Sequence, residues 1–99
     1  MQYRRDEILR MLQQHGDTIR SYDVRSLSVF GSAARDECSE GSDLDLLVEF
    51  QKKSFDAYMD LRDFLQQLFG CKVDLVPVDC VKPRLRPHVL AEAIRVPGL

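Results

Sequence analysis

The chain has few cysteines, no long hydrophobic run and no excess of positive charge, and each shortage argues against a class of protein. Its three cysteines, Cys38, Cys71 and Cys80, show no CxxC spacing. An odd set without that spacing argues against a disulfide scaffold and against a zinc knuckle. No stretch is apolar over the length that a bilayer requires. Because the N-terminus is polar and lacks an apolar signal segment, we expect a cytoplasmic protein without a membrane span.

The formal net charge of the 99 residues is −2, so the whole chain has no electrostatic attraction to nucleic acid or to a membrane surface. The basic residues Lys82, Arg84 and Arg86 are interpreted as a solvated helix start, with contact to an acidic partner or a nucleotide phosphate as the alternative. The length allows one core but leaves no room for a second domain that selects a substrate. We therefore expect a single domain over residues 1–99.

The hydrophobic pattern predicts helices and strands that alternate along the chain. Ser54 is a plausible N-cap and Gly70 a plausible stop for one of the helices. Gly16 is expected to weaken or divide another. In the last helix, Leu85 and Leu90 are expected to face the core. We predict helices over residues 3–22, 54–68 and 83–95, and strands over residues 27–30, 43–50 and 72–78. This order indicates one α/β layered structure.

Two acids open the second predicted strand. Side chains alternate between the faces of a strand, so Asp43 and Asp45 share one face while Leu44 and Leu46 take the other. Two carboxylates held side by side repel each other unless a cation lies between them. Paired oxygen ligands are what Mg²⁺ accepts while it keeps its other positions for water and phosphate. The spacing therefore predicts a metal site, although Asp43 alone could be a turn acid after Gly41 and Ser42.

A third acid, Asp74, lies within the apolar residues of the third predicted strand. A buried carboxylate needs a partner or a cation, so Asp74 is a candidate third member of the site. Several carboxylates that hold two Mg²⁺ ions are the arrangement that phosphoryl and nucleotidyl transfer require. Asp74 would then hold the second ion and accept a proton from the acceptor.

The Gly31-Ser32 turn follows the first predicted strand. Glycine lets the backbone approach a phosphate, to which the following N–H groups and the Ser32 hydroxyl can donate. Arg35 could add positive charge to a triphosphate. The alternatives are that Gly31 serves only a tight turn, Ser32 only a helix N-cap, and Arg35 only the solvated surface.

These residues together carry a family resemblance. Gly31-Ser32, ten intervening residues, Asp43-x-Asp45 and the later Asp74 resemble the signature of the DNA polymerase beta-like nucleotidyltransferases. The segments LSVFGS, SDLDLLVEF, CKVDLV and VKPRLRPHVLAEAIRV extend the likeness over almost the full length. More narrowly, the chain resembles the MNT-type minimal nucleotidyltransferases, the MntA-like antitoxins that accompany HEPN-domain toxins.

The resemblance implies an α/β fold with a small mixed β-sheet flanked by helices. It implies that the chain transfers AMP from ATP, with Mg²⁺, to a tyrosine of a partner HEPN toxin in a hetero-oligomer, and thereby silences the toxin. Gly31 and Ser32 would hold the triphosphate with help from Arg35, and Asp43, Asp45 and Asp74 would bind metal. Relatives often carry a basic residue at the position of Ala33 and a glycine at that of Asp36, so nucleotide binding is expected to be weaker here.

Two other functional classes remain open. The chain could be an antitoxin that masks its toxin by binding alone, without catalysis. It could also be a nucleotidyltransferase that acts on a small molecule or on nucleic acid. The donor base, the acceptor residue and the stoichiometry of a complex are not specified by the residues.

Overall fold

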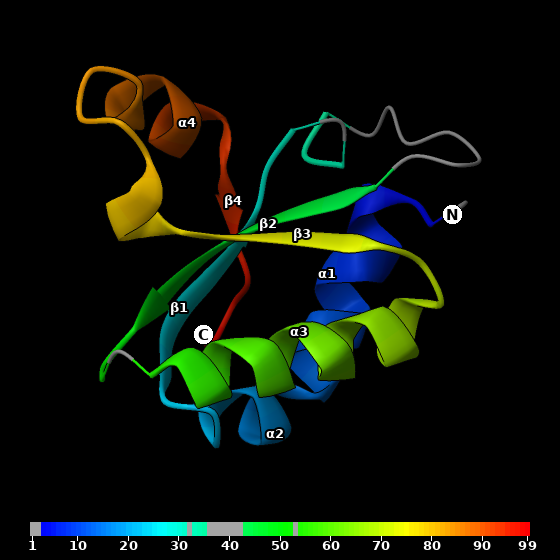
Figure 1. Cartoon of the computed structure of the whole chain (residues 1–99). Coiled ribbons are helices and arrows are strands. Elements are labelled where there is room, and N and C mark those ends of the chain that lie inside the picture. The colour runs from blue at the N-terminus through cyan, green and yellow to red at the C-terminus, as the bar shows by residue number, and fades with distance from the viewer. Residues whose placement is uncertain (1–2, 32, 36–42, 53) are drawn as a thin grey trace.

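The computed structural model describes residues 3–31, 33–35, 43–52 and 54–99. Within these ranges the chain forms one four-stranded sheet, in the order β3-β2-β1-β4 (Figure 1). Strand β1 pairs antiparallel with β2 and with β4, whereas β2 and β3 are parallel. The elements in chain order are α1 (Arg5–Gln14), α2 (Gly16–Arg20), β1 (Val24–Val29), β2 (Leu44–Phe50), α3 (Phe55–Phe69), β3 (Val73–Pro77), the short 3₁₀ helix η1 (Val78–Cys80), α4 (Arg86–Glu92) and β4 (Ile94–Arg95). The mixed sheet with helices confirms the expected fold class.

The two faces of the sheet have different surroundings. The apolar positions of β2 that alternate with its acid, Leu44, Leu46 and Val48, are fully buried and belong to one hydrophobic core. Helices α1, α2 and α3 contribute to that core, whereas α4 has no buried residue. In Figure 1, α4 lies on the opposite side of the central strands from α2 and α3. The face of β2 that carries Asp45 is therefore not covered by the core helices.

Local signals in the sequence fix the ends of α3. The Ser54 hydroxyl accepts a hydrogen bond from the Ala57 N–H at 3.3 Å, as an N-cap does. At the other end Gly70 adopts a left-handed conformation with φ of +64°, which glycine allows without strain. The Tyr58 hydroxyl donates to the Leu75 carbonyl at 2.7 Å and ties α3 to β3. Both predicted ends of this helix are confirmed to within one residue.

The division expected at Gly16 is confirmed, because the first predicted helix consists of α1 and α2, which meet at His15 and Gly16. Elsewhere the helix and strand boundaries differ from the expected ones. The last predicted helix is wrong in length, because α4 ends at Glu92 and Ala93 is extended. The chain then forms β4, whose Ile94 pairs with Val29. The edge of β1 offers backbone hydrogen bonds that a longer helix would leave unpaired.

The orientation of α4 also differs from the expectation. Leu85 and Leu90 do not enter the core, because their side chains are 45% and 49% exposed. The core face of the sheet is already covered by the other helices, so the inward positions are filled instead by Val96 and Leu99 after β4. No helix in the described ranges has the length and apolar content that crossing a bilayer would require.

Candidate functional site

The register of the parallel strands brings two of the predicted site residues together. Asp45 of β2 and Asp74 of β3 are paired positions. Neighbouring strands lie about 4.8 Å apart, and paired residues project from the same face. Leu46 and Leu75 are the next pair, and both are buried. Because a slip by one residue would turn the acids into the core, burial of these leucines fixes the two carboxylates side by side on the other face.

Asp43 lies just before the first residue of β2, at the same end of the sheet. The Leu44 N–H donates to the Lys72 carbonyl at 3.1 Å, which holds this end of β2 against the start of β3. The Asp43 carboxylate lies 4.0 Å from the Lys72 ammonium group, and the two side chains are 48% and 76% exposed. A solvated pair of this kind contributes little to stability, so Asp43 is available to a cation.

Gly31 lies directly against Asp45. The Phe30 N–H donates to the Asp45 carbonyl at 3.2 Å, so the end of β1 is bonded to β2 beside the acid. Gly31 has a φ of +68°. An added Cβ would overlap the Asp45 carboxylate oxygen Oδ2 and lie 3.3 Å from Asp45 Cβ and Cγ. Glycine is therefore needed here both for its backbone conformation and for the space that the Asp45 side chain occupies.

The turn after Gly31 carries Arg35. The Arg35 N–H donates to the Gly31 carbonyl at 3.3 Å, and the Arg5 guanidinium donates to the Ala34 carbonyl at 3.2 Å. Ala33 is 1% exposed and belongs to the core. Its methyl group therefore packs in the core, and the expected weakening of nucleotide binding at this position stays a prediction. The predicted roles of Ser32 and Asp36 fall on positions outside the described residues.

The pKa of Asp45 depends on three of the other predicted site residues. Burial raises the pKa of Asp45, and the nearby carboxylates of Asp74 and Asp43 raise it further, whereas Arg35 lowers it. Three acids and one arginine thus act on one another. A divalent cation would relieve the repulsion, and hard carboxylate oxygens are suitable ligands for Mg²⁺. In these ranges of the chain, however, no three acidic, histidine or cysteine side chains converge closely enough to hold an ion together.

One further residue at this site was not predicted from the sequence. Glu92 of α4 forms an ion pair with Arg35, with 3.6 Å between Glu92 Oε2 and Arg35 Nη1. Both side chains are about half exposed. The pair connects the turn after β1 to α4, and the same guanidinium lowers the pKa of Asp45. No spacing in the sequence links two residues so far apart, so only the fold reveals this contact.

Comparisons with known proteins show which family the chain belongs to. A family model described as a nucleotidyltransferase domain matches residues 6–96. The protein adenylyltransferase MntA of Thermococcus cleftensis is 37% identical over 93 residues, which span 92% of this chain and 94% of the relative. A candidate protein adenylyltransferase of Methanocaldococcus jannaschii is 38% identical over 93 residues, spanning 91% of this chain and 95% of the relative.

Solved structures agree with the sequence relatives. A candidate minimal nucleotidyltransferase has a TM-score of 0.73 at 38% identity and covers 87% of this chain and 93% of its own. A toxin-antitoxin structure with AMP-PNP has a TM-score of 0.70 at 20% identity, covering 98% of this chain and 75% of its own. At that identity the second likeness shows the fold alone.

Two glycines with the same backbone conformation provide a matched test of the contact between Gly31 and Asp45. Gly70→Ala should lower the free energy of unfolding by about 1 kcal/mol because of its positive φ, and Gly31→Ala should lower it by at least as much, because its added Cβ also overlaps Asp45. An added Cβ at Gly70 meets nothing within 4 Å, whereas at Gly31 it displaces the Asp45 carboxylate. Urea denaturation would measure the stability of both variants. In calorimetric titration, only Gly31→Ala should lose binding of a metal–nucleotide complex. Equal binding by the two variants would contradict the proposed role of this contact.

The raised pKa of Asp45 predicts how stability depends on pH without metal. An acid whose pKa is higher in the folded state destabilises the fold when ionised, so its cost appears as pH rises above the usual aspartate value near 3.8. In EDTA at pH 7, Asp45→Asn should leave the free energy of unfolding unchanged or raise it. Any gain should vanish below pH 3.8, where the carboxyl is protonated in both states.

Asp63→Asn, at an exposed position of α3, is the matched control and should show no such pH-dependent gain. A large loss of stability for Asp45→Asn at pH 7 would instead identify Asp45 as a structural acid.

Proposed function

We propose that this chain, which belongs to the nucleotidyltransferase domain family and is similar to the protein adenylyltransferase MntA, transfers AMP from ATP to a tyrosine hydroxyl of a HEPN-domain toxin and so acts as its antitoxin. The observation that carries this proposal is the paired register of Asp45 and Asp74 beside Gly31. Carboxylates of two strands and a glycine turn then lie at one end of the sheet, where a nucleotide can meet both.

The carboxylates supply the metal-binding side of the proposed site. Asp43, Asp45 and Asp74 would hold Mg²⁺, as one or two ions, whose charge would stabilise the phosphate oxygens in the transition state. The raised pKa of Asp45 supports this assignment, because the group is in an excess of negative charge that a cation would offset. The three side chains do not converge into a closed ligand set, so nucleotide oxygens would complete the coordination.

The turn after β1 supplies the phosphate-binding side. Gly31 lets the backbone come close, and Ser32 would donate its hydroxyl to the triphosphate. The Arg35 guanidinium has several donors in a plane, so it can bind a phosphate while Glu92 holds its Nη1. In this proposal Glu92 keeps Arg35 on the side of the sheet where the triphosphate binds.

The reaction follows from this arrangement. The tyrosine oxygen would bond to the α-phosphorus of ATP in line with the leaving group, while the bond from that phosphorus to the bridging oxygen breaks and pyrophosphate leaves. Asp74 would accept the hydroxyl proton, and its greater exposure than that of Asp45 supports this role. The acceptor would bring its own surface, because the described residues form one sheet and one core without an added substrate-binding layer.

Relatives support the choice of acceptor. The two relatives described above are named as a protein adenylyltransferase and a candidate protein adenylyltransferase. One solved neighbour is a tri-AMPylated Shewanella oneidensis HEPN toxin in complex with an MNT antitoxin, at 18% identity and a TM-score of 0.64. Another contains AMP-PNP, an ATP analogue. By analogy, the partner of this chain would be a HEPN toxin in a hetero-oligomer, and ATP would be the donor.

One observation favours a second candidate function. Because no three acidic, histidine or cysteine side chains of the described residues converge on one point, an antitoxin that masks its toxin by binding alone is the alternative. The two functions are distinguished by the mass of the toxin, which increases if AMP is transferred and stays the same if the toxin is only masked.

Incubation with its cognate HEPN toxin, ATP and Mg²⁺ should add one or more AMP groups to the toxin and release pyrophosphate, as intact-protein mass spectrometry would show. Asp43→Asn, Asp45→Asn and Asp74→Asn should each lower the rate at least about 100-fold, because a contact that stabilises transition-state charge is worth roughly 2.7 kcal/mol. Asp63→Asn is the matched control and should react at the parent rate.

Two results would change the assignment. Full activity of Asp74→Asn beside an inactive Asp45→Asn would remove Asp74 from the site. A toxin that is inhibited without any gain in mass would replace the enzyme with the masking antitoxin.

A further inference from the structure

Lys72 lies beside the proposed site, at the same end of the sheet. Asp43 and Lys72 directly precede Leu44 and Val73, the first paired residues of β2 and β3. The Leu44 N–H donates to the Lys72 carbonyl, and the side chains of Asp43 and Lys72 form an ion pair. Leu44 and Val73 are buried, and side chains alternate between the two faces of a strand. Lys72 therefore projects, like Asp43, from the face opposite to the core.

The charged side chains on this face form two neighbouring rows. The row at the strand ends is Asp43 with Lys72, and the next row is Asp45 with Asp74. Lys72 is two residues before Asp74, or about 7 Å along the chain. One lysine thus lies next to the three carboxylates of the proposed site.

Arg35 and Lys72 flank the paired acids on opposite sides. Strand β2, which carries Asp45, lies between β1 and β3 in the sheet. Arg35 belongs to the turn after β1, whereas Lys72 directly precedes β3. A polyphosphate bound over Asp45 would therefore meet a cationic side chain on each side.

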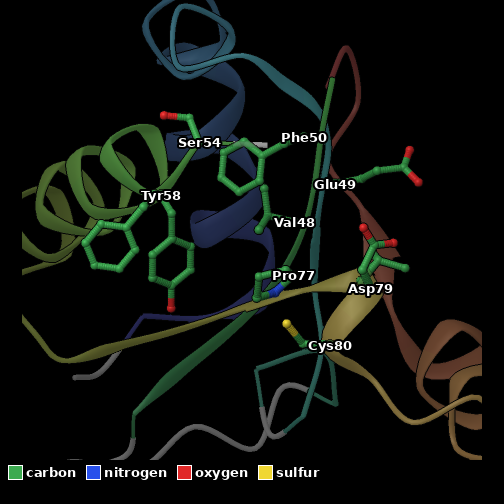
Figure 2. Close-up of a pocket in the computed structure, with 10 residues that line it drawn as sticks. Val48, Glu49, Phe50, Ser54, Tyr58, Pro77, Asp79 and Cys80 are labelled. Atoms are coloured by element: carbon green, nitrogen blue, oxygen red, sulfur yellow. The ribbon is translucent and has the colours of Figure 1, made fainter. Parts of the chain in front are cut away.

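The other end of these strands offers no such charge. A pocket of about 310 Å³ lies there, where Val48 and Tyr58 face one apolar space and Phe55 borders it (Figure 2). Val48 is three residues after Asp45 on β2, or about 10 Å along the strand. As far as the structure describes the lining of this pocket, it contains no lysine or arginine. Phosphate groups are therefore expected at the end of the sheet that carries Lys72.

The ion pair with Asp43 does not fix the Lys72 ammonium group in one position. Both side chains are solvent-exposed, and exposed ion pairs are weak and screened by salt. A lysine ammonium group has three donors on a flexible four-carbon stem. It can therefore turn from Asp43 to another acceptor a few ångströms away.

We infer that Lys72 is a phosphate-binding residue of the proposed site and that Asp43 is its partner only until a metal ion binds. When Asp43 ligates a cation, the Lys72 ammonium group donates instead to a phosphate oxygen of the nucleotide. Charge-assisted hydrogen bonds of this kind are among the strong ones in proteins. The inference rests on the proposed function, because it adds a residue to the same site.

Lys72→Met tests the inference through two affinities that should change in opposite directions. Binding of Mn²⁺ alone should become about twofold tighter or more, because Asp43 no longer has a competing cation. Binding of ATP in excess Mg²⁺ should become about tenfold weaker or more, because a charge-assisted hydrogen bond to phosphate is lost. Electron paramagnetic resonance of free Mn²⁺ and calorimetric titration with ATP measure the two affinities on the full chain.

Two further variants provide the matched comparisons. Lys72→Arg keeps the charge and the donors, so it should restore most of the affinity for ATP. Lys52 is exposed and lies two residues beyond Phe50, at the other end of β2, so Lys52→Met should change neither affinity. Because both lysines are exposed, all three variants should keep the melting temperature of the parent.

An NMR measurement on the parent detects the contact itself. The side-chain ¹⁵N signal of the Lys72 ammonium group should shift when the chain is saturated with ATP in Mg²⁺, whereas the signal of Lys52 should not. Lys72→Met would assign the first signal and Lys52→Met the second.

Two results would overturn the inference while the proposed function stands. One is equal affinity of Lys72→Met and the parent for ATP in Mg²⁺. The other is a loss of both Mn²⁺ and ATP binding in Lys72→Met, because Lys72 would then only support the structure of this end of the sheet. A parent chain that binds no ATP in Mg²⁺ would instead overturn the proposed function, and this inference with it.

Discussion

The parallel pairing of β2 with β3 is the constraint on which the rest of the structure depends. It places Asp45 against Asp74 on one face and Leu46 against Leu75 on the other. Like charges in directly paired positions are destabilising. The register is held nonetheless, because both leucines are buried and any slip by one residue would expose them and bury the acids. Packing on one face of the sheet thus stabilises a repulsive arrangement on the other.

The residues around Asp45 and Asp74 offset only part of the repulsion between the two carboxylates. Gly31 brings the end of β1 so close to Asp45 that no side chain fits between them. Arg35 lowers the pKa of Asp45 but does not cancel the effects of burial and of the neighbouring acids. Glu92 holds the same arginine from the side of α4. In the proposed function, a cation and a polyphosphate would offset this repulsion, as expected where function is gained at some cost in stability.

Much of this arrangement could be predicted from local sequence. The alternation of Leu44, Asp45 and Leu46 gave the faces of β2, and Ser54 and Gly70 gave the ends of α3, because each signal acts within a few residues. The end of the chain was predicted wrongly, since β4 forms by pairing with β1 and no local pattern records that edge. The contact of Arg35 with Glu92 and the pocket beside Phe55 join distant segments, so they follow from topology alone. Roles for Ser32 and Asp36 remain predictions.

The central claim is that three acids and the glycine turn form one site for a metal–nucleotide complex. Calorimetric titration of the chain with ATP, in excess Mg²⁺ and again in EDTA, tests it most directly. Binding should require Mg²⁺ and be lost in the Asp43→Asn, Asp45→Asn double variant, while Asp63→Asn should bind as the parent does. Equal affinity of the parent and the double variant for ATP in Mg²⁺ would contradict it.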